Sequence, residues 1–203
     1  MTDPVQPQLV LASASTVRRT LLQAAGVAVT PAAAAIDEPA IKAAMLAEGA
    51  PPRDIADKLA ETKALKVARR FPDAFVLGGD QVLVHDGALL DKPANRDVAA
   101  DQLRMLRGGT HQLLSAAVIV ASDQTIWRHI GEVRLQMRDF SDAFLNRYLA
   151  AEGPAILDCV GGYRLEGRGI QLFSRIEGDY FTVLGIPLLE TLNYLRQHGI
   201  LDT

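Results

Sequence analysis

Short apolar runs alternate with helical patterns along this chain of 203 residues. The runs predict strands at 8–12, 75–84, 87–90, 112–121, 126–137 with a break, 169–176 and 182–183. Helices are predicted at 16–25, 41–48, 54–70, 96–106, 141–151 and 187–198. The tripeptide His85-Asp86-Gly87 has the chemistry of a tight hairpin turn, and a hairpin joins antiparallel strands. The pattern therefore predicts an α/β protein whose sheet is mixed rather than purely parallel.

Composition narrows the class of protein. The chain is 49% hydrophobic and 22% charged, with a formal net charge of -3, which is typical of a soluble globular protein long enough for one large domain or two closely joined lobes. No apolar stretch reaches the ~18 residues that a membrane helix needs, and an acidic balance argues against nucleic acid as a partner. The single Cys159 allows no internal disulfide, so we expect a cytoplasmic protein.

The segment Leu9 to Arg19 predicts a site for an anion. An apolar strand ends at small hydroxyl residues that include Ser13, and Arg18 and Arg19 then fall in the first turn of a helix. Cations there oppose the helix dipole at a cost of roughly 0.3 to 1 kcal/mol each, unless a phosphate binds the same N–H groups. A solvated arginine pair is the alternative. An export signal is disfavoured because Gln23 and Pro31 interrupt the apolar stretch.

Two charged residues lie inside apolar patterns. Asp80 follows two glycines within the run 75–84, and a buried carboxylate is costly unless it is paired or binds a metal, so Asp80 is the leading candidate for a base or metal ligand. A simple turn at this point is the alternative. Lys63 lies on the apolar stripe of the helix 54–70, where it either extends to the solvent or points into a cleft.

Further candidates are weaker by themselves. Lys92 precedes a proline that stiffens its loop, so it could reach a phosphate. Asp37, Glu38 and Glu61 could serve a metal, and His111 could be a base, although a structural histidine is the expected role at a strand entrance. Together with the arginines, these residues suit a polyphosphate bound with a divalent cation, where a metal-activated water attacks phosphorus.

These residues occur in blocks that resemble one known family. The blocks are LASASTVRRTLLQAAG, GGDQV, LLDKP, GGTHQ and VGGYRLEGRGIQLFSRIEGDYFTVLGIPLLE, which reach from about Leu9 to about Leu195. In this order they are similar to the Maf family of nucleoside triphosphate pyrophosphatases. The resemblance implies a single Maf-type domain over residues 1–203, with a fold like that of inosine triphosphate pyrophosphatase: a curved mixed sheet, flanking helices and a cleft between two lobes.

The same resemblance implies a reaction and a set of residues. The family hydrolyses a nucleoside triphosphate to the monophosphate and pyrophosphate with Mg or Mn, and a homodimer is common. Asp80 would be the catalytic acid-base residue, and Glu38 with Asp80 would contact the metal. The residues implied to hold the triphosphate are Ser13, Arg18, Arg19, Lys63 and Lys92.

The resemblance leaves the base open. Gln81 and Glu166 are similar to the 7-methyl-GTP subfamily, and a glutamate can accept hydrogen bonds from a guanine edge. Relatives acting on dTTP or UTP usually have Thr and Gln at these positions. The 7-methyl-GTP subfamily typically carries a tryptophan at the position of Val17. An aromatic ring there could stack on the methylated base, and Val17 has none. Cys159 stands where a lysine is frequent. Val17 and Cys159 leave a second function open. In this alternative the chain is a nucleotide-binding regulator of cell division that inhibits septum formation, and it hydrolyses nucleotides weakly or not at all.

Overall fold

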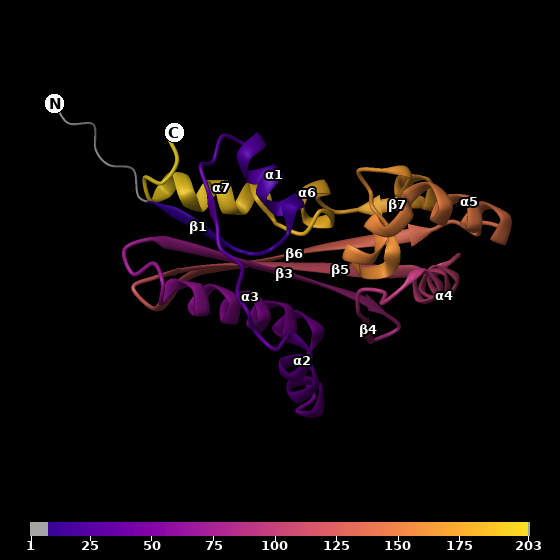
Figure 1. Cartoon of the computed structure of the whole chain (residues 1–203), viewed down its shortest axis with the longest axis horizontal. Coiled ribbons are helices and arrows are strands. Elements are labelled where there is room, and N and C mark those ends of the chain that lie inside the picture. The colour runs from indigo at the N-terminus through magenta and orange to yellow at the C-terminus, as the bar shows by residue number, and fades with distance from the viewer. Residues whose placement is uncertain (1–7, 203) are drawn as a thin grey trace. The chain divides into compact units, whose positions relative to one another are not determined.

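The computed structural model describes residues 8–202, and these belong to two compact units (Figure 1). Unit 1 comprises the chain up to residue 80, residues 115–131 and the chain from residue 184, and unit 2 comprises residues 81–114 and 132–183. The strands follow the hydrogen-bonded order β2-β1-β3-β5-β6-β7, with β4 also paired to β3. The β1–β2 and β1–β3 pairs are parallel, whereas β3–β4 and β6–β7 are antiparallel. The prediction of an α/β protein with a mixed sheet is confirmed.

Unit 1 is built around β1 (Leu9–Ala12), whose four residues are all buried. β1 lies between β2 (Thr30–Pro31) and the first half of β3 (Phe75–His85), with Ala12 opposite Gly78. Figure 1 shows α3 (Pro52–Ala68) on one face of these strands, and α1 (Thr16–Ala24) and α7 (Leu188–Gln197) on the other. The helix α3 buries Leu59 and Val67 on its apolar stripe, as its spacing predicts.

The helix α2 (Glu38–Ala47) is different, because none of its side chains is buried. It begins where the Asp37 carboxylate accepts a hydrogen bond from the Ala40 amide at 3.0 Å, with Pro39 in its first turn. The predicted helices 41–48 and 54–70 therefore both begin a few residues earlier than expected. In each case a proline that was not assigned to the helix occupies its first turn, where its missing N–H has no intrahelical role.

Unit 2 begins with the predicted hairpin. The second half of β3 pairs with β4 (Ala88–Leu90), and the turn residues Asp86 and Gly87 have φ of 49° and 79°. This left-handed conformation suits a two-residue turn, so the hairpin is confirmed. The strands β5 (Thr110–Ala121) and β6 (Gln124–Met137) contribute to both units. The helices α4 (Arg96–Leu106) and α5 (Asp142–Glu152) begin at the side-chain caps Asn95 and Ser141.

Three of the predictions for residues 126–183 are wrong. The strand predicted at 169–176 is preceded by short 3-10 helices η1 (Gly153–Asp158), η2 (Val160–Gly162) and η3 (Arg168–Leu172), so β7 covers only Phe173–Glu177. A Cβ at Gly169 would lie 2.3 Å from the Arg164 carbonyl oxygen, and this close approach belongs to a tight loop. The break predicted in 126–137 is absent, since β6 is continuous between its paired neighbours β5 and β7.

The third correction concerns residues 182–183, which lie in the one-turn helix α6 (Tyr180–Val183) and not in a strand. The Asp179 carboxylate accepts hydrogen bonds from the Thr182 amide at 2.7 Å and from its hydroxyl at 2.9 Å. This local capping outweighs the preference of β-branched residues for strands. No helix within residues 8–202 is long and apolar enough to cross a membrane.

Candidate active site

The loop after β1 has the helix start that the sequence predicts. Ser15 is the N-cap of α1, and its hydroxyl accepts a hydrogen bond from the Arg18 amide at 3.3 Å. The Ser15 amide in turn donates to the Ser13 hydroxyl at 3.2 Å, which draws the loop into a tight turn. Gly26, with φ of 79°, follows the end of the helix. The strand, hydroxyl loop and helix therefore form one continuous βα unit.

Arg18 is buried, which excludes the alternative of a fully solvated arginine pair. Its Nε donates to the Gly185 carbonyl at 2.6 Å, and its Nη1 donates to the Ser13 hydroxyl at 3.0 Å. Burial lowers the pKa of Arg18, and the carboxylates of Asp80 and Glu38 act in the opposite direction. The guanidinium therefore serves as a buried cation within the electrostatic range of both acids, and it is bound by the distant Gly185 carbonyl and by the nearby Ser13 hydroxyl.

The two glycines before Asp80 make room for different neighbours. A Cβ at Gly78 would lie 2.1 Å from the Ala60 carbonyl oxygen on α3, and a Cβ at Gly79 would lie 3.2 Å from Arg18 Nε. The pair thus lets α3 and the Arg18 guanidinium approach β3 closely. The predicted run through Asp80 is a continuous strand, so the alternative of a simple turn is excluded.

Lys63, Asp80 and Glu38 meet at one ammonium group. Lys63 Nζ lies 2.5 Å from Asp80 Oδ1 and 2.8 Å from Glu38 Oε1. Asp80 is 5% exposed and Lys63 is 9% exposed, so this ion pair is largely shielded from water. Lys63 therefore does not extend to the solvent from the apolar stripe of α3; it points at the strand that carries Asp80. Of the two outcomes that the sequence left open, the inward one is confirmed.

The carboxylate pair fits the chemistry of a small divalent cation. Glu38 and Asp80 place an oxygen each on the same ammonium, so both can face one positive charge. Magnesium is usually bound by one or two carboxylates together with water and substrate phosphates. Within residues 8–202, no three His, Cys, Asp or Glu side chains gather into a group that could hold a metal ion. A cation at Glu38 and Asp80 would need further ligands, for which water and substrate phosphate oxygens are suited.

Three other acid and base candidates have structural contacts. Asp37 caps α2, as described above. Glu61 accepts hydrogen bonds from Thr125 at 3.0 Å, Arg128 at 2.8 Å and Lys58 at 3.1 Å, which holds α3 to β6. His111 lies 2% exposed with its Nε2 2.8 Å from the Tyr163 hydroxyl. Burial, followed by the charge of His85, lowers the pKa of His111 to about 4, so its ring is neutral at pH 7.

The remaining predicted residues are distributed between the units. In unit 1, Val17 and Arg19 are half-buried on α1, and the Arg19 side chain makes no hydrogen bond or ion pair with any described residue. In unit 2, the Gln81 amide donates to the carbonyls of Thr182 and Val183, each at 3.0 Å. The sequence predicted a base-reading role for Gln81 but not this anchoring of α6.

Lys92 and Glu166 belong to unit 2 and lie within electrostatic range of the same thiol. Burial, and then Glu166, raise the pKa of Cys159 to about 11, while Arg164 and Lys92 oppose the shift. Glu166 also accepts a hydrogen bond from Arg164 Nε at 3.2 Å. The thiol is therefore protonated at neutral pH and is no nucleophile. In unit 2, Arg164 and Glu166 thus form an ion pair, and Lys92 acts on the same thiol through its charge.

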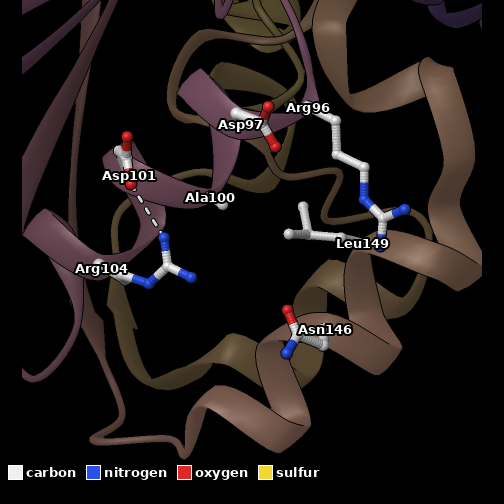
Figure 2. A pocket seen from close by; sticks show the side chains of 7 residues that line it. All are labelled: Arg96, Asp97, Ala100, Asp101, Arg104, Asn146 and Leu149. Atoms are coloured by element: carbon white, nitrogen blue, oxygen red, sulfur yellow. Dashed lines mark hydrogen bonds and ion pairs between the residues drawn. The ribbon is translucent and has the colours of Figure 1, made fainter.

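A pocket of about 230 Å³ lies elsewhere in unit 2, between α4 and α5 (Figure 2). Figure 2 shows Arg104 paired with Asp101 on one side of the pocket and Asn146 on the other. The Arg104 Nη1 and Asp101 Oδ1 atoms are 2.9 Å apart. The pocket is lined by Arg96, Asp97, Ala100, Asp101, Arg104, Asn146 and Leu149. None of the site residues predicted from the sequence lines it, so it is separate from the groups described above.

Comparison with known proteins identifies the family. The family model described as "Maf-like protein" matches residues 8–198. The chain belongs to the Maf family. This Maf protein is 52% identical to a nucleoside triphosphate pyrophosphatase of Ruegeria pomeroyi, over 96% of this chain and 98% of that protein. It is 49% identical to a 7-methyl-GTP pyrophosphatase of Rhizobium meliloti, over 98% of this chain and all of that protein.

One further relative and one solved structure are also similar to this chain. A nucleoside triphosphate pyrophosphatase of Roseobacter denitrificans is 54% identical over 94% of this Maf chain and 96% of that protein. Among solved structures, a nucleoside-triphosphatase / dITP/XTP pyrophosphatase from Mycobacterium abscessus matches over 95% of this chain and 94% of that chain, with 13% identity and a TM-score of 0.40. The family membership rests on the family model and the sequence relatives.

Proposed function

We propose that this Maf protein is a nucleoside triphosphate pyrophosphatase that releases pyrophosphate and a nucleoside monophosphate. The observation that carries the proposal is the buried Asp80 carboxylate, held beside the cationic groups of Lys63 and Arg18. A carboxylate in this setting can accept a proton, and the cations can bind phosphate oxygens. Relatives about 50% identical over nearly their whole length carry the same activity in their names.

In the proposed reaction, water attacks the α phosphorus. As the new O–P bond forms, Asp80 accepts a proton from the water, and the bond between the α phosphorus and its bridging oxygen breaks. The leaving pyrophosphate carries the electron pair of that bond. Arg18, Arg19, Lys63, Lys92 and the Ser13 hydroxyl are the groups proposed to bind the triphosphate. When bound at Glu38 and Asp80, Mg or Mn would stabilise negative charge on the phosphate oxygens.

We propose 7-methyl-GTP as the preferred substrate, with dTTP and UTP as the alternatives. Glu166 supports the guanine derivative, because a carboxylate can accept hydrogen bonds from the N1 and amino groups of guanine. Gln81 supports it only through its similarity to the 7-methyl-GTP subfamily. The relative named as a 7-methyl-GTP pyrophosphatase adds to this support. Val17 is aliphatic and cannot supply an aromatic stack at its position, so the preference would rest on hydrogen bonding.

The test is a product assay with purified protein in Mg or Mn. The nucleotides are 7-methyl-GTP, GTP, UTP, dTTP and 5-methyl-UTP, and pyrophosphate and phosphate are measured separately. We expect pyrophosphate with fastest turnover of 7-methyl-GTP, and the label from ¹⁸O-water in the monophosphate. Release of phosphate, or label in pyrophosphate, would contradict attack at the α phosphorus. Equal rates on GTP and 7-methyl-GTP would contradict the substrate preference alone.

A further inference from the structure

Lys63 occupies the place that the proposed function assigns to a divalent cation. Its ammonium group lies 2.8 Å from Glu38 Oε1 and 2.5 Å from Asp80 Oδ1, and its side chain is largely buried. The two acids proposed to bind a metal are therefore already paired with a positive charge from the protein itself.

An ammonium group and a metal ion would compete for these oxygens. Both are cations, and two positive charges a few ångströms apart repel strongly where water is largely excluded. A divalent cation entering between Glu38 and Asp80 would therefore require Lys63 to withdraw. Withdrawal leaves a buried ammonium without its carboxylates, which is costly unless another anion receives it.

The phosphate chain of a nucleotide is such an anion. The lysine side chain is long and flexible, so the ammonium can move while the helix stays in place. The backbone of α3 is fixed by its close approach to Gly78 and its buried apolar stripe. Glu38, by contrast, lies at the start of α2, which has no buried side chain. Movement can thus be confined to Lys63 and Glu38.

We infer that Lys63 is an internal counter-ion that keeps the Glu38–Asp80 pair closed to divalent cations until phosphate oxygens draw its ammonium away. The inference rests on the proposed function, since it concerns the metal and triphosphate of that site. Its consequence is positive coupling: the metal binds more tightly when phosphate is present, and phosphate binds more tightly when the metal is present. Free metal alone would bind weakly to the resting protein.

The experiment measures Mn²⁺ binding by electron paramagnetic resonance to the full-length protein and to two variants. Lys63→Met removes the ammonium and retains an apolar stem suited to the stripe of α3. Lys66→Met is the matched control, because Lys66 is exposed on the same helix and removes the same charge. Without phosphate, we expect Lys63→Met to bind Mn²⁺ at least about tenfold more tightly than the wild type, and Lys66→Met to differ by less than about twofold.

A second set of titrations adds methylenediphosphonate, a pyrophosphate analogue that is not hydrolysed. The coupling that remains in Lys63→Met measures direct contact between metal and phosphonate, and the excess in the wild type measures the contribution of Lys63. We expect an excess of at least about fivefold. Mn²⁺ affinity in Lys63→Met equal to or weaker than in the wild type, or the same coupling in both proteins, would overturn the inference.

Two controls test whether each variant folds and whether the wild type is active. Circular dichroism establishes that each variant is folded, and Lys63→Gln replaces Lys63→Met if the methionine variant is not. Pyrophosphate release by the wild type is measured in parallel. An active enzyme without tighter Mn²⁺ binding in the variant would refute only the counter-ion role. An inactive wild type whose Lys63 variant binds Mn²⁺ more tightly would refute only the proposed function.

Discussion

Gly78→Ala should damage both stability and turnover, because it pushes α3 away from the strand that carries Asp80. The added Cβ would lie 2.1 Å from the Ala60 carbonyl oxygen and 2.9 Å from the Ala64 Cβ. Carbon atoms in good contact are about 3.5 to 4.0 Å apart, so the helix backbone has to move by roughly 1 Å. Overpacking of this kind costs about 1–3 kcal/mol of unfolding free energy.

The same displacement reaches the active site, because Lys63 lies between Ala60 and Ala64 on the helix. A shift of about 1 Å would weaken the contact between Lys63 and Asp80, and misplacement of that size can cost about 100-fold in rate. Urea unfolding and kcat for pyrophosphate release measure the two effects. We expect an unfolding free energy lower by about 1–3 kcal/mol and a kcat lower by at least about tenfold.

Gly26→Ala is the matched control. A Cβ there would meet nothing within 4 Å, and the only cost is its φ of +79°. The strain should lower the unfolding free energy by about 1 kcal/mol and leave kcat unchanged. If Gly78→Ala kept the wild-type kcat, the contact between α3 and β3 would not position Lys63. If it kept the wild-type unfolding free energy, α3 would accommodate the added Cβ without strain.

Four further changes test other parts of the structure. Asp80→Asn should lower kcat at least about 100-fold with unchanged circular dichroism, since the amide cannot accept the proton; near-normal turnover would exclude Asp80 as the base. Arg18→Lys should lower the unfolding free energy by about 1–3 kcal/mol, because one ammonium cannot reproduce both guanidinium hydrogen bonds, and wild-type stability in urea would contradict this. Tyr163→Phe should cost about 1–3 kcal/mol, because His111 Nδ1 already has no partner and Nε2 would lose its own; a neutral effect in urea would show that the pair is not stabilising. The pKa of His111 is lowered from 6.5 to about 4 in the folded protein, so between these pH values the unfolded chain binds a proton that the folded protein does not. The neutral His111 ring therefore contributes its full stability above pH 6.5, and this stability is lost as the pH falls toward 4. The full contribution is about 3 kcal/mol, so the unfolding free energies at pH 7 and pH 4.5 should differ less in His111→Gln than in the wild type; an equal difference in the two proteins would refute this.

Local sequence signals predicted the parts of this fold that depend on neighbouring residues. The hairpin at Asp86-Gly87 and the helix start at residue 16 depend on a few adjacent residues, and both were predicted correctly. Residues 182–183 were predicted wrongly because β-branched side chains favour strands. The Asp179 cap that decides the helix is also local and could have been found from the sequence.

The sequence by itself determined the α/β class, the start of the helix that carries Arg18 and Arg19 in its first turn, and the presence of charged groups in apolar patterns. It also showed a conflict at Lys63 without deciding its outcome. Only the tertiary structure decided that Lys63 turns inward to Glu38 and Asp80, and that Arg18 is bound by the Gly185 carbonyl, 167 residues away. The physical reason is range: periodicity and capping act within a few residues, whereas the pairing of a buried charge depends on which distant segments the packed sheet and helices bring to it.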